Sequence, residues 1–103
     1  MATPLKYGLY GEYLIKEVND GEWKRQYVFR FPNNYGASII KNIGSYGYED
    51  DLFELAVLYF EGDKFEITYN TPITQDVVGF LSNDDILNLL EDIKKLKGGS
   101  IDE

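Results

Sequence analysis

This sequence contains no histidine and no cysteine, so an enzyme would have to use carboxylates, lysine, tyrosine or serine. The absence of histidine and cysteine excludes thiolate chemistry, disulfides and zinc–sulfur sites, and it removes the commonest general base. The densest group of acids is Glu49-Asp50-Asp51. Two carboxylates can share acid and base roles inside a pocket, but adjacent acids in a loop are typical of solvated charge, and the spacing of a calcium-binding loop is missing. We therefore expect no enzyme, no metal site and no cofactor.

Tyrosines with glycine neighbours are the second group of candidates. They occur as Tyr35-Gly36 and as Tyr46-Gly47-Tyr48. Tyrosine offers rigid, amphipathic contact area and glycine lets a loop conform, which is the combination favoured in binding loops. The alternative is that these rings fold back over the edge of a sheet. The predicted partner-binding residues are Tyr35, Tyr46, Tyr48, Glu49, Asp50 and Asp51.

The charge of the chain narrows the class of partner. A formal net charge of −8 disfavours direct binding to nucleic acid or to an anionic membrane, since both depend on lysine and arginine. The same charge suits a basic protein partner. No stretch is apolar for long enough to predict a membrane span or a signal peptide, so we expect a cytoplasmic protein.

A single domain is expected over residues 1–103, with frayed tails at 1–6 and 98–103. The apolar content of 44% and aromatic content of 16% are sufficient for a packed core. The most apolar run, Leu52–Phe60, is joined to the strand-like run Phe65–Tyr69 through Gly62-Asp63. Treating Gly62-Asp63 as a two-residue turn with Gly62 at positive φ places Phe60 opposite Phe65 and Glu61 opposite Lys64.

Two further strands are predicted before this hairpin, at Tyr7–Val18 and Trp23–Phe31, around a turn that contains Asp20-Gly21. A three-residue loop with Gly21 left-handed gathers one apolar face, namely Leu9, Tyr13, Ile15, Tyr27, Phe29 and Phe31. A two-residue turn would instead place Lys16 opposite Arg25, and we prefer the three-residue loop. A short strand at Ala37–Lys41 and a long loop at Asn42–Asp51 follow.

A short strand or buried connector is predicted at Val77–Leu81, followed by a helix that begins at Ser82. Asp85 completes a capping box with Ser82, and Gly98-Gly99 is expected to end the helix. An apolar stripe recurs at helical spacing at Ile86, Leu87, Leu89, Leu90, Ile93 and Leu96. The fold class is therefore α+β, an antiparallel β-meander of about five strands with one C-terminal helix packed on a sheet face.

The run Leu52–Phe60 is apolar on both of its faces, which one helix cannot cover. The second face is expected to be covered either by the curled first hairpin or by another copy of the chain, which leaves a homo-oligomer possible.

Four strings carry a resemblance to a known group of proteins. They are Tyr35-Gly36-Ala37-Ser38, Ser45-Tyr46-Gly47, the run Leu52–Leu58, and Thr71–Leu81 with the capped helix after it. Together they resemble short uncharacterised proteins encoded by bacteriophages and prophages, over residues from about 27 to 96. The resemblance implies a viral protein made in a bacterial cytoplasm, but no activity or site residue.

The expected function is that of a non-enzymatic phage or prophage accessory protein. Its partner would be a host or defence protein, bound through the Tyr/Gly loop and the acidic surface. One alternative is an acidic nucleic-acid mimic that occupies a DNA- or RNA-binding groove. A small-ligand pocket lined by Tyr35, Tyr46 and Tyr48, or a structural role in the virion, are further alternatives.

Overall fold

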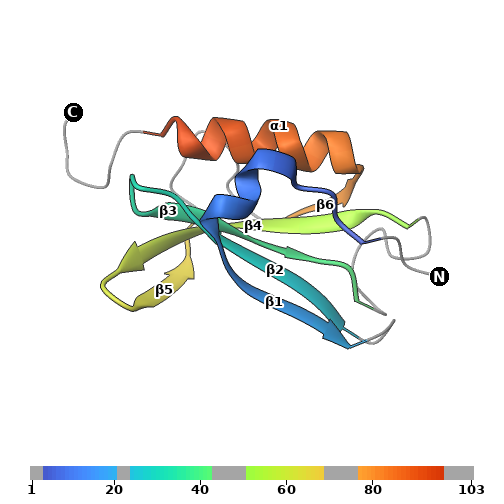
Figure 1. The fold of residues 1–103 in the computed structure, drawn as a ribbon, viewed down its shortest axis with the longest axis horizontal. Helices are drawn as coiled ribbons and strands as arrows, with labels where there is room; N and C mark the ends of the chain where they lie inside the picture. The colour runs from blue at the N-terminus through green and yellow to red at the C-terminus, as the bar shows by residue number, and fades with distance from the viewer. Residues whose placement is uncertain (1–3, 21–23, 43–50, 69–76, 97–103) are drawn as a thin grey trace.

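The computed structural model describes residues 4–20, 24–42, 51–68 and 77–96 (Figure 1). In chain order the elements are a 3₁₀ helix η1 (Gly8–Tyr13), strands β1 (Leu14–Asp20), β2 (Lys24–Arg30), β3 (Tyr35–Ile40), β4 (Phe53–Glu61), β5 (Lys64–Ile67) and β6 (Val78–Leu81), and helix α1 (Asn83–Lys94). The strands form one antiparallel sheet in the order β1-β2-β3-β4-β5, and α1 packs on one face of it. The predicted α+β fold class is confirmed.

Strand β4 lies at the centre of the fold. One of its edges pairs with β3, and its other edge is shared, with Phe53 and Leu55 paired to β6 and residues 58–61 paired to β5. The predicted β4–β5 register is confirmed, because Phe60 lies opposite Phe65 and Glu61 opposite Lys64. Gly62 has φ 62° as expected. Tyr69 lies outside the described residues.

The first predicted strand is wrong over its first half, where the structure has η1 instead. Gly8 takes φ 54°, which turns the chain out of an extended path. Because 3₁₀ side chains three residues apart lie above one another, the tyrosines at positions 7, 10 and 13 share a side. They meet the sheet edge-on through Tyr7–Phe29, Tyr10–Phe31 and Tyr13–Phe31. Leu9, expected on the sheet face, is 89% exposed.

The β1–β2 connection spans residues 21–23, since Asp20 lies opposite Lys24. This agrees with a three-residue loop and contradicts the two-residue alternative, because Arg25 lies opposite Asn19. Gly21 itself lies outside the described residues. The expected apolar face holds for Tyr27, Phe29 and Phe31, which are buried. It fails at Ile15, which is exposed because the register shifts between Leu14 and Lys16.

Helix α1 begins as predicted and ends earlier than predicted. The capping box is present, with the Ser82 hydroxyl accepting from the Asp85 backbone N–H. The helix stops at Lys94, before Gly98-Gly99, which lie outside the described residues. Asn33, from the β2–β3 turn, donates its side-chain amide to the carbonyls of Ile93 and Leu96, each at 2.9 Å. These bonds satisfy carbonyls that a helix end leaves open.

Each face of the sheet carries a cluster of side chains that are buried within one chain. On the α1 side the core contains Phe53, Leu55 and Val57 together with Ile86, Leu90 and Ile93. On the opposite side Val28, Leu58 and Phe60 form a smaller buried cluster. The Phe65 ring lies 5.1 Å from the Phe60 ring and the Arg30 guanidinium 4.8 Å from it. Burial of this second face therefore does not require a second copy of the chain.

Residues 5 and 6 are docked on the fold, which differs from the frayed tail expected over residues 1–6, and residues 1–3 lie outside the described residues. Leu5 is buried, and its backbone N–H donates to the Tyr27 hydroxyl. Lys6 and Asn83 exchange two hydrogen bonds of 2.7 and 2.8 Å between backbone and side-chain amide. The start of α1 thus holds residues 5 and 6 in place. None of the helices in the described ranges is long and apolar enough to cross a membrane.

Tyr10 links η1 to α1 and should make stability depend on pH. Its hydroxyl donates to Glu91 Oε1 at 2.5 Å, and this bond, with partial burial and the charge of Glu91, raises the pKa of Tyr10 to about 12. Because the pKa of Tyr10 is raised in the folded state, its protonated hydroxyl stabilises the folded state fully below pH 10.0, the ordinary pKa of tyrosine. This stabilisation is lost as the pH rises toward 12. Between these values the free energy of unfolding of the wild type should fall more steeply than that of Tyr10→Phe. Denaturant titrations at a series of pH values measure the free energy of unfolding of both proteins. If it fell equally with pH in the wild type and in Tyr10→Phe, the bond between Tyr10 and Glu91 would not be the cause.

Candidate protein-binding surface

The β4–β5 hairpin presents side chains that the rest of the described chain leaves accessible. Its turn is formed by Gly62 and Asp63, with Gly62 in the left-handed region that favours glycine. Arg30 of β2 fixes the turn, since its Nη1 donates to the Gly62 carbonyl at 2.9 Å. All four residues of β5 are exposed. The hairpin is therefore a firmly attached edge of the sheet with an accessible outer strand.

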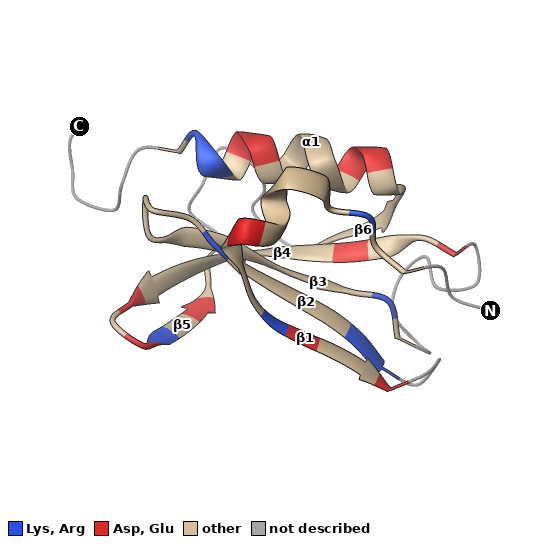
Figure 2. Ribbon diagram, viewed as in Figure 1, with Lys and Arg blue, Asp and Glu red and all other residues tan. Residues whose placement is uncertain are grey.

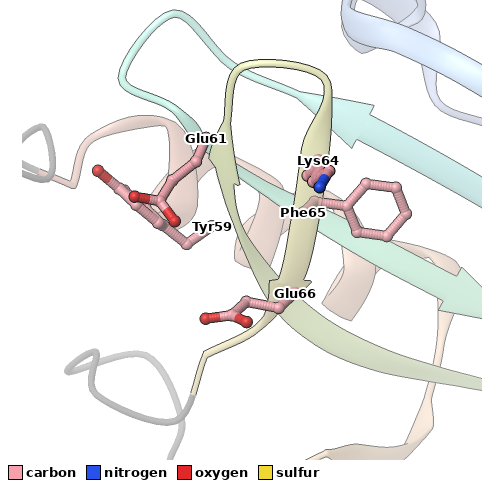
Figure 3. Close-up of a pocket in the computed structure, with 5 residues that line it drawn as sticks. All are labelled: Tyr59, Glu61, Lys64, Phe65 and Glu66. Atoms are coloured by element: carbon pink, nitrogen blue, oxygen red, sulfur yellow. The ribbon is translucent and has the colours of Figure 1, made fainter.

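A shallow hollow of about 210 Å³ lies on one side of this hairpin. It is lined by Tyr59, Glu61, Lys64, Phe65 and Glu66. The register explains why the acids gather, because Tyr59 lies opposite Glu66 and Glu61 opposite Lys64. In Figure 3 the carboxylates of Glu61 and Glu66 lie on the same side as Tyr59, while the Phe65 ring points away from them. Two carboxylates beside a phenol ring suit a cationic group such as lysine or arginine.

The other side of the hairpin is apolar. Phe65 and Ile67 lie opposite Phe60 and Leu58, which are buried. The outer pair itself is only partly covered, with exposed fractions of 45% for Phe65 and 44% for Ile67. The apolar cluster of the second face thus continues to the edge of the sheet and ends there in two half-exposed side chains. We call Glu61, Phe65, Glu66 and Ile67 the hairpin surface.

The prediction that Tyr35 lies in a loop is wrong, because it belongs to a strand next to the hairpin. It is the first residue of β3, and its half-buried ring stands edge-on to Tyr59 with the ring centres 5.2 Å apart. Since Tyr59 lines the hollow, Tyr35 supports its wall. The structure therefore joins one predicted site residue to the hairpin, through a contact between paired strands.

Asp51, another predicted site residue, binds within the chain. Its carboxylate lies 2.8 Å from Lys41 Nζ, which also stands 3.9 Å from the centre of the Phe53 ring. The Lys41 side chain is 1% exposed, and a charge so buried needs a partner. The ion pair therefore joins the residue that precedes the predicted Tyr/Gly loop to its last residue. Tyr46, Tyr48, Glu49 and Asp50 lie outside the described residues.

The residues that sequence reasoning missed are the four of the hairpin surface. The signal was present in Lys64–Ile67, where charged and apolar residues alternate in a strand with one half-covered face. We expected Phe65 and Ile67 to pack on one side of the sheet, and the sequence alone did not show that their outer edge is open.

The map of charges bears on the nucleic-acid mimic. A mimic needs carboxylates in a continuous row, without bases among them, as phosphates are on a backbone. In Figure 2 acidic and basic segments are interleaved over β1, β2 and β5, and the acids of α1 lie apart from those of β5. Within the described ranges, no group of three or more acids is close enough to hold a metal ion. The two acids of the hairpin surface, Glu61 and Glu66, therefore lie beside an apolar sheet edge and are not continued into a row by the acids of α1.

Comparisons with protein-family models, with curated proteins and with solved structures give no match to this chain. The functional interpretation therefore depends on the geometry of the surface and the chemistry of its side chains.

Proposed function

We propose that this chain is a non-enzymatic protein-binding module that engages its partner through the hairpin surface. The observation that carries the proposal is the pair Phe65 and Ile67, each close to half exposed beside two carboxylates, at a sheet edge with which no strand of the described residues pairs. Apolar side chains at such an edge are a template for contact with another chain. A binding role is favoured over a catalytic one because the chain has no histidine or cysteine to act as base or nucleophile.

The proposed biological setting is a bacteriophage or prophage, with a host or defence protein as the partner in the bacterial cytoplasm. Its support is the resemblance of the strings at Tyr35–Ser38, Leu52–Leu58 and Thr71–Leu81 to short phage proteins. The net charge of −8 favours a partner whose contacting surface is basic.

The Tyr/Gly loop is a second candidate surface. The observation that favours it is the Lys41–Asp51 ion pair, which brings the two ends of the segment together. Surface loops whose ends lie close together are frequently functional. If this loop were the anchor, Tyr46→Ala with Tyr48→Ala would weaken binding by about 2 kcal/mol or more.

A capture experiment separates the two surfaces. Four immobilised proteins are exposed to bacterial lysate and the retained proteins are identified by mass spectrometry. They are the wild type, Phe65→Thr with Ile67→Thr, Tyr46→Ala with Tyr48→Ala, and Leu9→Thr. The Leu9 variant is the matched control, because it removes an exposed apolar side chain from a different element.

We expect a protein that the wild type and the Leu9 variant retain and the Phe65/Ile67 variant loses. Loss in the tyrosine variant alone would move the site to the loop. Retention of nothing specific by the wild type would reject the proposed function. Denaturation of each variant confirms that it is folded, since threonine is well tolerated in an exposed strand.

A further inference from the structure

Only every second residue of β5 directs its backbone N–H and C=O groups toward β4. Thr68 N–H donates to the Val57 carbonyl at 2.9 Å, which marks an inward-facing position next to β5. Because hydrogen-bonded pairs alternate along antiparallel strands, Lys64 and Glu66 also bond to β4. The N–H and C=O groups of Phe65 and Ile67 then point to the outer edge. No strand among the described residues pairs with that edge.

The two edges of the sheet differ in how they resist pairing. The edge strand β1 has a register shift at Leu14–Lys16, a common device against the addition of another strand. Strand β5 pairs regularly from Lys64 to Ile67 and has no proline. Its two outward-facing backbone positions are also the residues with half-exposed apolar side chains.

We propose that β5 takes up one antiparallel β-strand from the partner, with an apolar–basic–apolar sequence. The basic residue would lie opposite Glu66, on the side of the hollow with Glu61 and Tyr59. The two apolar residues would lie opposite Phe65 and Ile67 on the other side, because directly opposed residues share a face. This inference rests on the proposed function and specifies the chemistry of its partner.

A second copy of this chain is the alternative occupant of the same edge, and like charges oppose it in one of its two symmetric registers. Symmetric antiparallel pairing through Phe65 and Ile67 would place the two copies of Glu66 directly opposite one another, and like charges in that position are destabilising. Each chain also has a net charge of −8. In the other symmetric register, centred on Phe65, Lys64 of one copy would lie opposite Glu66 of the other. The net charge of each chain is therefore what favours a basic strand from a different protein over a second copy. Because β5 offers only two bonding residues, affinity must also come from the side chains.

The test uses the full chain and a short synthetic peptide that contains Val-Lys-Val-Glu, which places lysine opposite Glu66 and glutamate opposite Lys64. Amide hydrogen exchange is followed by NMR with and without the peptide. We expect slower exchange at Phe65 and Ile67 when peptide is present. Lys64 and Glu66 are internal controls, since their amides are already bonded to β4 and should not change. Unchanged exchange at Phe65 and Ile67 would overturn the proposal, as would full protection of both amides before peptide is added.

A charge swap tests the register. Glu66→Lys should weaken binding of the Val-Lys-Val-Glu peptide by about fivefold and should strengthen binding of a Val-Glu-Val-Glu peptide. Asp92→Lys, an exposed change on α1 with the same effect on net charge, should alter neither affinity beyond the effect of overall charge. Equal effects of the two variants would reject a contact at Glu66. Capture of a lysate protein through the hairpin surface without peptide protection would keep the proposed function and reject strand addition.

Discussion

Replacing Gly36 with alanine is expected to lower the free energy of unfolding by about 3 kcal/mol or more. Gly36 lies in β3 between Arg30 of β2 and Leu58 of β4. A Cβ atom there would be 1.9 Å from the Phe29 carbonyl oxygen and 2.8 Å from Cε1 of the Phe60 ring. The oxygen belongs to the backbone of a neighbouring strand, so it cannot move away without disturbing the ladder. Chemical denaturation measures the loss.

Gly62→Ala is the matched control for this substitution. Gly62 has φ 62°, but a Cβ there would meet nothing within 4 Å. Its replacement therefore adds only the strain of an alanine in the left-handed region, about 1–2 kcal/mol. If Gly36→Ala destabilised no more than Gly62→Ala, the close approach of β2 and Phe60 would not be what requires glycine.

Elements whose signals are local could be predicted from the sequence. The Gly62-Asp63 turn sets the β4–β5 register by itself, and Ser82 with Asp85 sets the start of α1. The end of α1 could not be predicted in this way. It depends on Asn33, which is 60 residues from Ile93 and meets it only in the folded chain.

The first strand shows what happens when two periodicities compete. Residues 7–13 contain tyrosines at a spacing of three, which is the 3₁₀ repeat, but their apolar character also suits a strand. The choice depends on the aromatic rings of Phe29 in β2 and of Phe31 just after it, against which Tyr7 and Tyr13 pack. Such long-range packing overrides local propensity and is not visible in a single window of sequence.

The candidate site was less predictable than the fold for the same reason. Acidic and aromatic residues could be recognised by type, but their accessibility depends on which face of the sheet α1 covers. Helix α1 packs on the opposite face and leaves Phe65 and Ile67 half exposed. The burial of Lys41 separately determines that Asp51 pairs with it. The sequence predicts Asp51 to be a partner-binding charge in the loop, whereas its position beside the buried Lys41 gives it a role within the chain.

Leu90→Ala is expected to lower the free energy of unfolding by about 2–5 kcal/mol, the range for a fully buried leucine. Leu90 has 0% exposure and belongs to the cluster that joins α1 to β3 and β4. Removing its side chain leaves a cavity between helix and sheet that the paired strands cannot close. Leu89→Ala is the control, because Leu89 is only partly buried beside the same cluster and should lose less. Guanidinium denaturation gives both values, and equal losses would show that α1 is not held to the sheet by its buried stripe.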